Sequence, residues 1–215
     1  MIKRLIYDVD DTLITNVDFN PAMRSLLEML GLYSKQNLIT MNKAFDMYEE
    51  KYNNYNVNDY RKVLEDALHI KLSDTFMRVM LHTFSMCVTP KDDKLINTLD
   101  NLSKQYELVL LTNYFETVQR KRLERVGINS YFKECYGEFL TKPNKEAYYL
   151  ACGSHTPEEC VMIGDNLYLD VLKPQELGMY SIWVNTKHKR LKEYPINKIY
   201  KASEITDTYI KKLKK

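Results

Sequence analysis

The chain has 215 residues, of which 45% are hydrophobic and 28% are charged, and its formal net charge is +2. The near balance of charge predicts no general attraction to a nucleic acid polymer or a membrane surface, and no apolar stretch approaches the roughly 20 residues of a membrane span. The four cysteines lack C-x-x-C spacing and the first residues lack the pattern of a signal peptide, so we expect reduced thiols and a cytoplasmic protein.

A buried strand is predicted over residues 4–9 (RLIYDV), because a short, continuous apolar run is typical of a strand covered on both faces. Four helices are then expected in a row, with no strand between them, over residues 20–31, 36–52, 58–70 and 73–88. Asn20, Asn58 and Ser73 are the expected N-caps of three of these helices. Pro21 suits the first turn of the first helix, and Gly31 its end.

After Pro90 strands and helices alternate. Helices are predicted over residues 93–105, 116–127, 144–153 and 169–178, and strands over 107–112, near 135–139, and over 160–165 and 180–185. This alternation implies right-handed crossovers and a parallel sheet. The predicted fold class is therefore α/β, with a Rossmann-like core (residues 1–15 and 89–215) covered by helices on both faces. An all-helical cap (residues 16–88) is inserted after the first strand.

Ligands of an open parallel sheet bind in the crevice at the carboxyl ends of its strands. Three predicted strands end in DVDDT, LLTNY and MIGDNLYLD, and a strand-loop segment leads to LTKPN. Carboxylates crowded at one edge repel one another, and a bound Mg²⁺ would offset that repulsion, while a hydroxyl and an ammonium suit a phosphate. The residues that this crevice is expected to gather are Asp8, Asp10, Thr112, Lys142, Asp165 and Asp170.

These segments resemble the four motifs of the haloacid dehalogenase superfamily, in the right order. DVDDTL is similar to the first motif, D-x-D-x-T, and LLTN to the second, a Thr or Ser after a hydrophobic strand. Lys142 in KPN matches the third motif, and GDNLYLD the fourth, G-D-x-x-x-x-D. The helical insert resembles the class-one cap of the family. One departure is Thr15, where many relatives have an Asp.

The resemblance implies a Mg²⁺-dependent phosphatase of the family's phosphotransfer branch. Asp8 would be the nucleophile that attacks phosphorus and forms an aspartyl-phosphate. Asp10 would protonate the leaving oxygen and later activate the water. Thr112, the backbone amide of Asn113, and Lys142 would hold the phosphate oxygens.

The same resemblance implies the ligands of the metal. The carboxylates of Asp8 and Asp165 and the main-chain carbonyl of Asp10 would bind Mg²⁺, and Asp170 would support the site from outside the ligand set. Asp165 is also a candidate N-cap of the following helix, a role compatible with metal binding. Asp11 is interpreted as a turn residue, because the family tolerates Gly there.

Other metal chemistry finds less support in the sequence. In an EF-hand loop beginning at Asp8, the sixth position would be Leu13 instead of Gly and the twelfth Phe19 instead of Glu. The histidines have no metal-ligand spacing and are interpreted as structural or surface residues: His69, His82, His155 and His188.

The segment EEKYNNYNVNDY within the expected cap is rich in tyrosine and asparagine. It is interpreted first as a loop between helices. The alternative is a polar and aromatic lip that stacks on a base, in which case a nucleoside monophosphate would be the preferred substrate. The side chains in question are those of Tyr48, Tyr52, Tyr55, Tyr60, Asn53, Asn54 and Asn56.

The expected partner is a small phosphorylated metabolite, because a cap over the crevice limits access by bulky substrates, and the expected protein is a monomer or a homodimer. A sugar phosphomutase of the same superfamily would share every core residue and remains open. A dehalogenase is disfavoured by the second Asp of DVDDT and the acidic fourth motif. A non-catalytic phospho-accepting or metabolite-binding protein is a further alternative, although receiver domains are shorter and place the phosphorylated Asp on a later strand.

Overall fold

The computed structural model describes residues 1–193, 195 and 197–214, so residues 194, 196 and 215 of the predicted core lie outside the described residues. The described strands form a six-stranded parallel sheet in the order β3-β2-β1-β4-β5-β6. This order places the topological switch point between β1 and β4. The strands are β1 (Arg4–Tyr7), β2 (Glu107–Leu111), β3 (Cys135–Tyr136), β4 (Cys160–Gly164), β5 (Tyr180–Val184) and β6 (Lys198–Ile199).

Helices cover both faces of this sheet, as the alternating pattern predicts. Successive residues of a strand point to opposite faces, so Leu5 belongs to the same apolar cluster as Leu99 of α5, while Ile6 belongs to the cluster of Tyr148 of α7 on the other face. The central strand is therefore buried on both sides, which explains its continuous apolar run. The core helices are α5 (Asp93–Ser103), α6 (Glu116–Arg125), α7 (Lys145–Cys152), α8 (Lys173–Glu176) and α9 (Asp207–Lys211).

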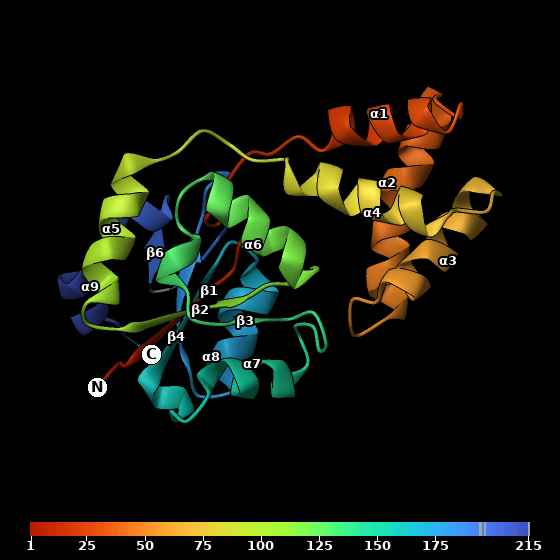
Figure 1. The fold of residues 1–215 in the computed structure, drawn as a ribbon. Helices are drawn as coiled ribbons and strands as arrows, with labels where there is room; N and C mark the ends of the chain where they lie inside the picture. The colour runs from red at the N-terminus through yellow and green to blue at the C-terminus, as the bar shows by residue number, and fades with distance from the viewer. Residues whose placement is uncertain (194, 196, 215) are drawn as a thin grey trace.

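The segment between β1 and α5 forms helices that lie together, beside the sheet and next to α6 (Figure 1). Two connections join these helices to the core, one before α1 and one after α4, while both chain termini lie on the far side of the core (Figure 1). The arrangement is that of a Rossmann-like α/β core with a helical cap. The cap helices are α1 (Asn20–Met29), α2 (Lys35–Lys51), α3 (Val57–Leu68) and α4 (Asp74–Ser85). The boundaries between cap and core at residues 15/16 and 88/89 stay predictions.

The cap has its own apolar core, which reaches onto α6. Tyr48, Tyr60 and Phe84 are each fully buried in it. Phe115, the residue before α6, and Val118 in its first turn are buried in the same cluster. The cap therefore packs directly on the helix that follows β2. None of the helices in the described parts of the chain is long and apolar enough to cross a membrane.

Several element ends differ from the sequence prediction. Helix α3 is capped by Asn56, whose side chain accepts hydrogen bonds from the N–H groups of Asn58 and Asp59, so the prediction of Asn58 as the cap is wrong by two residues. Helix α1 starts at Asn20 itself and has no side-chain N-cap bond. Ser73 caps α4 as predicted, accepting from the N–H of Phe76.

The last part of the core also differs. The helix predicted over residues 169–178 is a π-helical stretch (Leu167–Leu172) followed by the short α8. Wide turns of this kind occur often at functional sites. Strand β6 is absent from the prediction, because two residues between polar neighbours give no detectable period.

Replacing each of the two asparagines by alanine should show which one caps α3. Asn56→Ala removes two hydrogen bonds to the first turn of α3 and is expected to lower the free energy of unfolding by about 1 kcal/mol. Asn58→Ala is the matched control, because Asn58 is exposed within the same turn and should change stability by less than about 0.5 kcal/mol. Urea unfolding of both variants measures the difference, and equal losses would contradict the assignment of Asn56 as the cap.

Candidate functional site

Strand β1 delivers two carboxylates to the switch point of the sheet. The N–H of Asp8 still pairs with the carbonyl of Ile163 (2.9 Å), which extends the β1–β4 ladder by one residue. The chain then turns tightly, and the N–H groups of Leu13 and Ile14 both donate to the carbonyl of Val9 (2.9 and 3.0 Å). Asp8 is thus fixed at the strand end, and its side chain is only 11% exposed.

A buried ammonium stands between two carboxylates at this point. Lys142 Nζ donates to Asp8 Oδ1 (2.9 Å) and to Asp170 Oδ1 (2.7 Å), and its side chain is 3% exposed. Burial disfavours the charge of Lys142, but Asp170 and Asp8 together raise its pKa above the usual value. Burial raises the pKa of Asp8 to about 8, although Lys142 lowers it. One ammonium is therefore not enough to compensate the carboxylates of the site.

The fourth motif supplies the other carboxylates. Asp165 follows β4, and Asp170 lies on the π-helical stretch, where its Oδ2 accepts the N–H of Asn166 (3.0 Å). A Cβ on Gly164 would lie 2.2 Å from the carboxylate of Asp170, so glycine is required for this approach. The side chain of Asn166, not that of Asp165, caps the following turn, which leaves the carboxylate of Asp165 available to a ligand.

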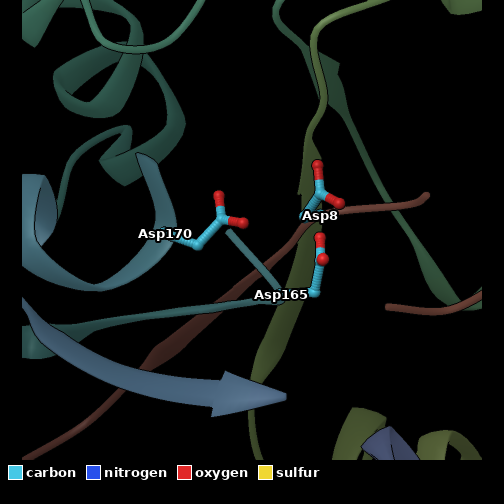
Figure 2. Close-up of side chains that lie close together, drawn as sticks. All are labelled: Asp8, Asp165 and Asp170. Atoms are coloured by element: carbon cyan, nitrogen blue, oxygen red, sulfur yellow. The ribbon is translucent and has the colours of Figure 1, made fainter. Parts of the chain in front are cut away.

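These carboxylates form a candidate cation site. Oxygen atoms of Asp8, Asp165 and Asp170 all lie within 4.8 Å of one another, and Figure 2 shows the three carboxylates gathered around one point. Burial raises the pKa of Asp165 to about 6, with Asp170 and Asp11 acting in the same direction. Hard oxygen ligands with unfavourable negative charge suit a divalent cation such as Mg²⁺. The donor set therefore fits the predicted metal.

Strand β2 contributes the second motif. Thr112 is 2% exposed, and its N–H donates to the carbonyl of Tyr136 (3.0 Å). Asn113 holds the loop that carries the buried lysine, because its amide accepts the N–H of Lys142 (2.8 Å) and donates to the carbonyl of the same residue (2.9 Å). Gly137 permits this packing, since a Cβ there would lie 2.0 Å from the carbonyl oxygen of Thr112.

Two polar residues of α6 complete the site and were missed by the sequence analysis. Gln119 and Arg122 are 0% and 1% exposed, and both bind the carboxylate of Asp10. Their spacing of three residues places them on one face of the predicted helix. That spacing was the available signal, but only the tertiary structure reveals that this polar pair is buried.

The carboxylate cluster opens into a pocket of about 550 Å³ between core and cap. Its core side contains Asp8, Asp10, Thr112, Lys142, Asp165 and Asp170, so the structure brings together all six side chains expected in one crevice, and Asn113 lies beside them. On the cap side, α2 presents Asn42, Phe45, Asp46 and Glu49, which recur at helical spacing along one stripe.

The tyrosine-rich segment lies mostly inside the cap. Tyr48 stacks on Tyr52 (ring centroids 4.8 Å apart) and contacts Tyr60 edge to face (5.1 Å). Tyr55 alone among these four tyrosines lines the pocket, where it is 6% exposed and its hydroxyl donates to Glu49. The structure gives Tyr52 no place in the pocket, so Tyr55 is the one tyrosine of the expected lip that a ligand there could contact.

Comparison with known proteins identifies the family. The family model for haloacid dehalogenase-like hydrolases matches residues 2–176. The chain therefore belongs to this family of hydrolases, and the resemblance seen in its four motifs is confirmed.

The relatives differ in what their names say they act on. The chain is 24% identical over 207 residues to pyrimidine 5'-nucleotidase YjjG of Escherichia coli, covering 88% of each chain. It is 27% identical to glyceraldehyde 3-phosphate phosphatase of Methanocaldococcus jannaschii, covering 100% of both. The fold is similar to that of magnesium-bound HAD-hydrolase YfnB of Bacillus subtilis (TM-score 0.65, 23% identity, 94% and 96% of the two chains). It is also similar to that of L-2-haloacid dehalogenase of Xanthobacter autotrophicus (TM-score 0.67, 15% identity, 95% and 96%).

Asp165→Asn should stabilise the metal-free protein. Because the pKa of Asp165 rises from 3.8 to about 6 on folding, its ionised form destabilises the native state, by about 1–3 kcal/mol above pH 6. The gain from the substitution should therefore be full above pH 6, shrink as the pH falls from 6 to 4, and vanish below the unfolded-state pKa. Urea unfolding in excess chelator at pH 7.5, 5 and 3.5 measures this dependence.

Asp11→Asn is the control for that experiment. Asp11 lines the same pocket but is paired with Lys187, so its replacement removes a favourable ion pair together with a weaker repulsion of Asp165, and it should stabilise the protein less than Asp165→Asn does. A gain in stability for Asp165→Asn that persists at pH 3.5 would contradict the conclusion that ionised Asp165 destabilises the native state. An equal gain for Asp11→Asn would contradict it too.

Proposed function

We propose that the protein is a Mg²⁺-dependent phosphatase that hydrolyses a small phosphorylated metabolite through an aspartyl-phosphate on Asp8. The observation that carries the proposal is the placement of Lys142 between Asp8 and Asp170, with Asp165 beside them, in the lining of the pocket between core and cap. This arrangement combines a nucleophilic carboxylate, a cation for phosphate oxygens and a second, metal-type cation site.

In the first step, a carboxylate oxygen of Asp8 attacks the phosphorus of the substrate, and the bond between phosphorus and the ester oxygen breaks. Asp10 transfers a proton to the departing oxygen, so the leaving group departs as an alcohol. In the second step, Asp10 takes a proton from water as that water attacks the phosphorus, and the bond to Asp8 breaks. Inorganic phosphate is released and both carboxyl groups return to their starting states.

Three further groups stabilise the charge on the transferring phosphoryl group. Thr112 offers its hydroxyl and Asn113 its backbone N–H at the end of β2, and Lys142 offers its ammonium from the neighbouring loop. Asn113 also fixes the backbone of Lys142 through two hydrogen bonds, so hydroxyl and ammonium keep a constant separation. Such preorganised donors act without reorganisation during the reaction.

Asp8, Asp165 and the carbonyl of Asp10 would hold Mg²⁺, which supplies positive charge that neutralises phosphate oxygens. Asp170 is in our proposal a support, because its two oxygens are already bound, one to Lys142 and one to the N–H of Asn166. Asp170 thereby holds the ammonium that the phosphate needs.

The alternatives differ in what accepts the phosphoryl group. A phosphomutase of the same superfamily would return it to a sugar, and a non-catalytic sensor would not turn over. A dehalogenase would not need the acid Asp10 or the metal-type cluster of carboxylates. The names of the YjjG and M. jannaschii relatives, a nucleotidase and a phosphatase, support hydrolysis.

The charge of the pocket narrows the class of substrate. Eight carboxyl side chains line it, against the two cations Arg122 and Lys142, and both cations are bound to carboxylates. The cap side contributes Asp18, Asp46 and Glu49 and no cation among the described residues. A leaving group with a second negative charge would be repelled there, whereas an uncharged group with hydrogen-bond donors would be favoured. A pyrimidine nucleoside monophosphate has such a leaving group.

Turnover should require both Mg²⁺ and Asp8. A panel of phosphorylated metabolites, scored by release of inorganic phosphate, is expected to include at least one good substrate with Mg²⁺ and none in excess chelator. Ca²⁺ should inhibit, because its larger and looser coordination misplaces the phosphate for attack. Asp8→Asn should reduce phosphate release by at least about 1,000-fold while the protein stays folded.

The outcomes separate the candidate functions. Activity of Asp8→Asn within tenfold of wild type would exclude Asp8 as the nucleophile. Full activity in excess chelator would exclude a metal from the mechanism. Transfer to a sugar hydroxyl in place of release would favour the phosphomutase. Absence of turnover on every ester would favour a sensor.

The acidic cap should discriminate between two otherwise matched nucleotides. Orotidine 5'-monophosphate is uridine 5'-monophosphate with a carboxylate added to the base, so we expect kcat/KM to favour the uridine nucleotide by about fivefold or more, the magnitude of one close, solvated charge pair. Asp46→Asn and Glu49→Gln should each narrow that preference by a similar factor, and more in low salt than in high salt.

Glu50→Gln is the matched control, since Glu50 lies on the same helix and is exposed outside the lining of the pocket. It should leave the preference unchanged. A preference for the orotidine nucleotide, or equal shifts for Glu49 and Glu50, would reject the role given to cap charge without affecting the assignment of phosphatase chemistry.

A further inference from the structure

Asp10 is held by a closed ring of hydrogen bonds from α6. Gln119 Nε2 donates to Asp10 Oδ2 (2.8 Å), and Arg122 Nη1 donates to Asp10 Oδ1 (2.7 Å). Arg122 Nη1 also donates to Gln119 Oε1 (2.7 Å), so the two donors are fixed relative to each other. Both oxygens of Asp10 are thereby located, which leaves the carboxylate one orientation.

The ring also joins Asp10 to the second motif. Gln119 Nε2 donates to Thr112 Oγ1 (3.0 Å) as well as to Asp10, so one amide fixes the distance between the carboxylate and the hydroxyl. The side chain of Asp10 is nevertheless 47% exposed in the pocket, and each carboxylate oxygen has a second lone pair. A ligand in the pocket can therefore still reach the oriented carboxylate.

Arg122 is in turn held by the cap. Its Nε donates to the carbonyl of Cys87 (2.9 Å), directly after α4, and its guanidinium lies over the ring of Phe19 (5.2 Å), directly before α1. The two contacts are with the two connections between cap and core. The residue that orients Asp10 is therefore anchored at both ends of the cap.

Stability alone does not account for this arginine. A guanidinium that is 1% exposed loses its hydration, and Nη2 of Arg122 is buried without a hydrogen-bond partner. A buried ion pair of this kind is often replaceable by apolar side chains without loss of stability. An unsatisfied donor retained beside a half-exposed carboxylate is an arrangement that fits function better than packing.

We propose that Gln119 and Arg122 are positioning residues that hold the carboxyl group of Asp10 where its protonated form can transfer a proton to the leaving oxygen. The proposal rests on the acid role of Asp10 in the proposed function. Both residues act through the two oxygens of Asp10, and Gln119, unlike Arg122, does not line the pocket. Loss of either residue should therefore lower kcat/KM more for a leaving group that needs a proton to depart than for one that does not.

Two aryl esters of nearly the same shape measure that need. Phenyl phosphate releases phenol, whose pKa is about 10, whereas 4-nitrophenyl phosphate releases a much more acidic phenol that departs readily without a proton. The ratio kcat/KM reports the steps through phosphoryl transfer to Asp8, so hydrolysis of the intermediate does not contribute. Because neither ester carries a nucleoside, recognition by the cap is the same for both.

Arg122→Met and Gln119→Leu are expected to lower kcat/KM for phenyl phosphate by about 10- to 100-fold, within the range of general acid catalysis, and for 4-nitrophenyl phosphate by less than about threefold. Asp10→Asn should likewise lower kcat/KM more for phenyl phosphate than for 4-nitrophenyl phosphate. Adding Arg122→Met to Asp10→Asn should cost less than about threefold more, because both changes remove one function.

Arg125→Met is the matched control. Arg125 lies one turn further along α6 and donates to the carbonyl of Ser85 (3.1 Å), so it also contacts the end of α4. Its loss should lower kcat/KM for both esters by the same small factor. Urea unfolding shows which variants are folded, and if Arg122→Met is not, Gln119→Leu decides the matter, since it removes the bonds to Asp10 and Thr112 without breaking the contact with Cys87.

The results that would overturn the proposal are specific. Equal losses on both esters in a folded variant would give Gln119 and Arg122 a structural role only, and so would additive losses in the double variant. If Asp10→Asn shows no asymmetry between the esters, the acid role of Asp10 in the proposed function fails first, and the positioning role with it.

Discussion

The ammonium of Lys142 is the interaction on which the site depends. Asp8 stands at the end of β1 and Asp170 on the stretch after β4, and these neighbouring strands would bring two carboxylates together with no compensation. Lys142 arrives from the loop after β3, on the other side of β1, and Asn113 fixes its backbone. The parallel order of the sheet makes this meeting possible, because residues far apart in sequence share one edge.

The same constraint leaves the site with negative charge that one ammonium does not compensate. One ammonium serves Asp8 and Asp170, and burial raises the pKa of both Asp8 and Asp165. Without a metal, the uncompensated charge of these carboxylates lowers the stability of the folded protein, a cost that functional sites often retain. A second cation would relieve it, so the binding of a metal there and the destabilisation without one would have one physical origin.

Much of this arrangement could be predicted from sequence, and the remainder has identifiable causes. The apolar run before Asp8 and the alternation after Pro90 reflect burial on two faces, so the parallel sheet, its helical layers and the gathering of motif residues followed from local pattern. Helix starts were less certain, since Asn56 and Asn58 are both good caps and only the path of the chain selects one. The burial of Gln119 and Arg122 depends on the cap packing over α6, a long-range contact that leaves no local signal.

Asp8 and Asp10 are two residues apart, yet each has its own cation from a different element. Asp8 is 11% exposed and bound to Lys142, whereas Asp10 is 47% exposed and bound to Arg122. Arg122 binds the carbonyl of Cys87 at the end of the cap through its own side chain. Lys142 is linked to the cap only through its backbone neighbour, because the N–H of Thr141 donates to the carbonyl of Asn53 (2.9 Å). A displacement of the cap would therefore act on the partner of Asp10 through a side-chain bond and on the partner of Asp8 through the neighbouring backbone. In a phosphatase this arrangement would make both carboxylates depend on the position of the cap, and the proton transfer of Asp10 would depend on it through the shorter chain of contacts.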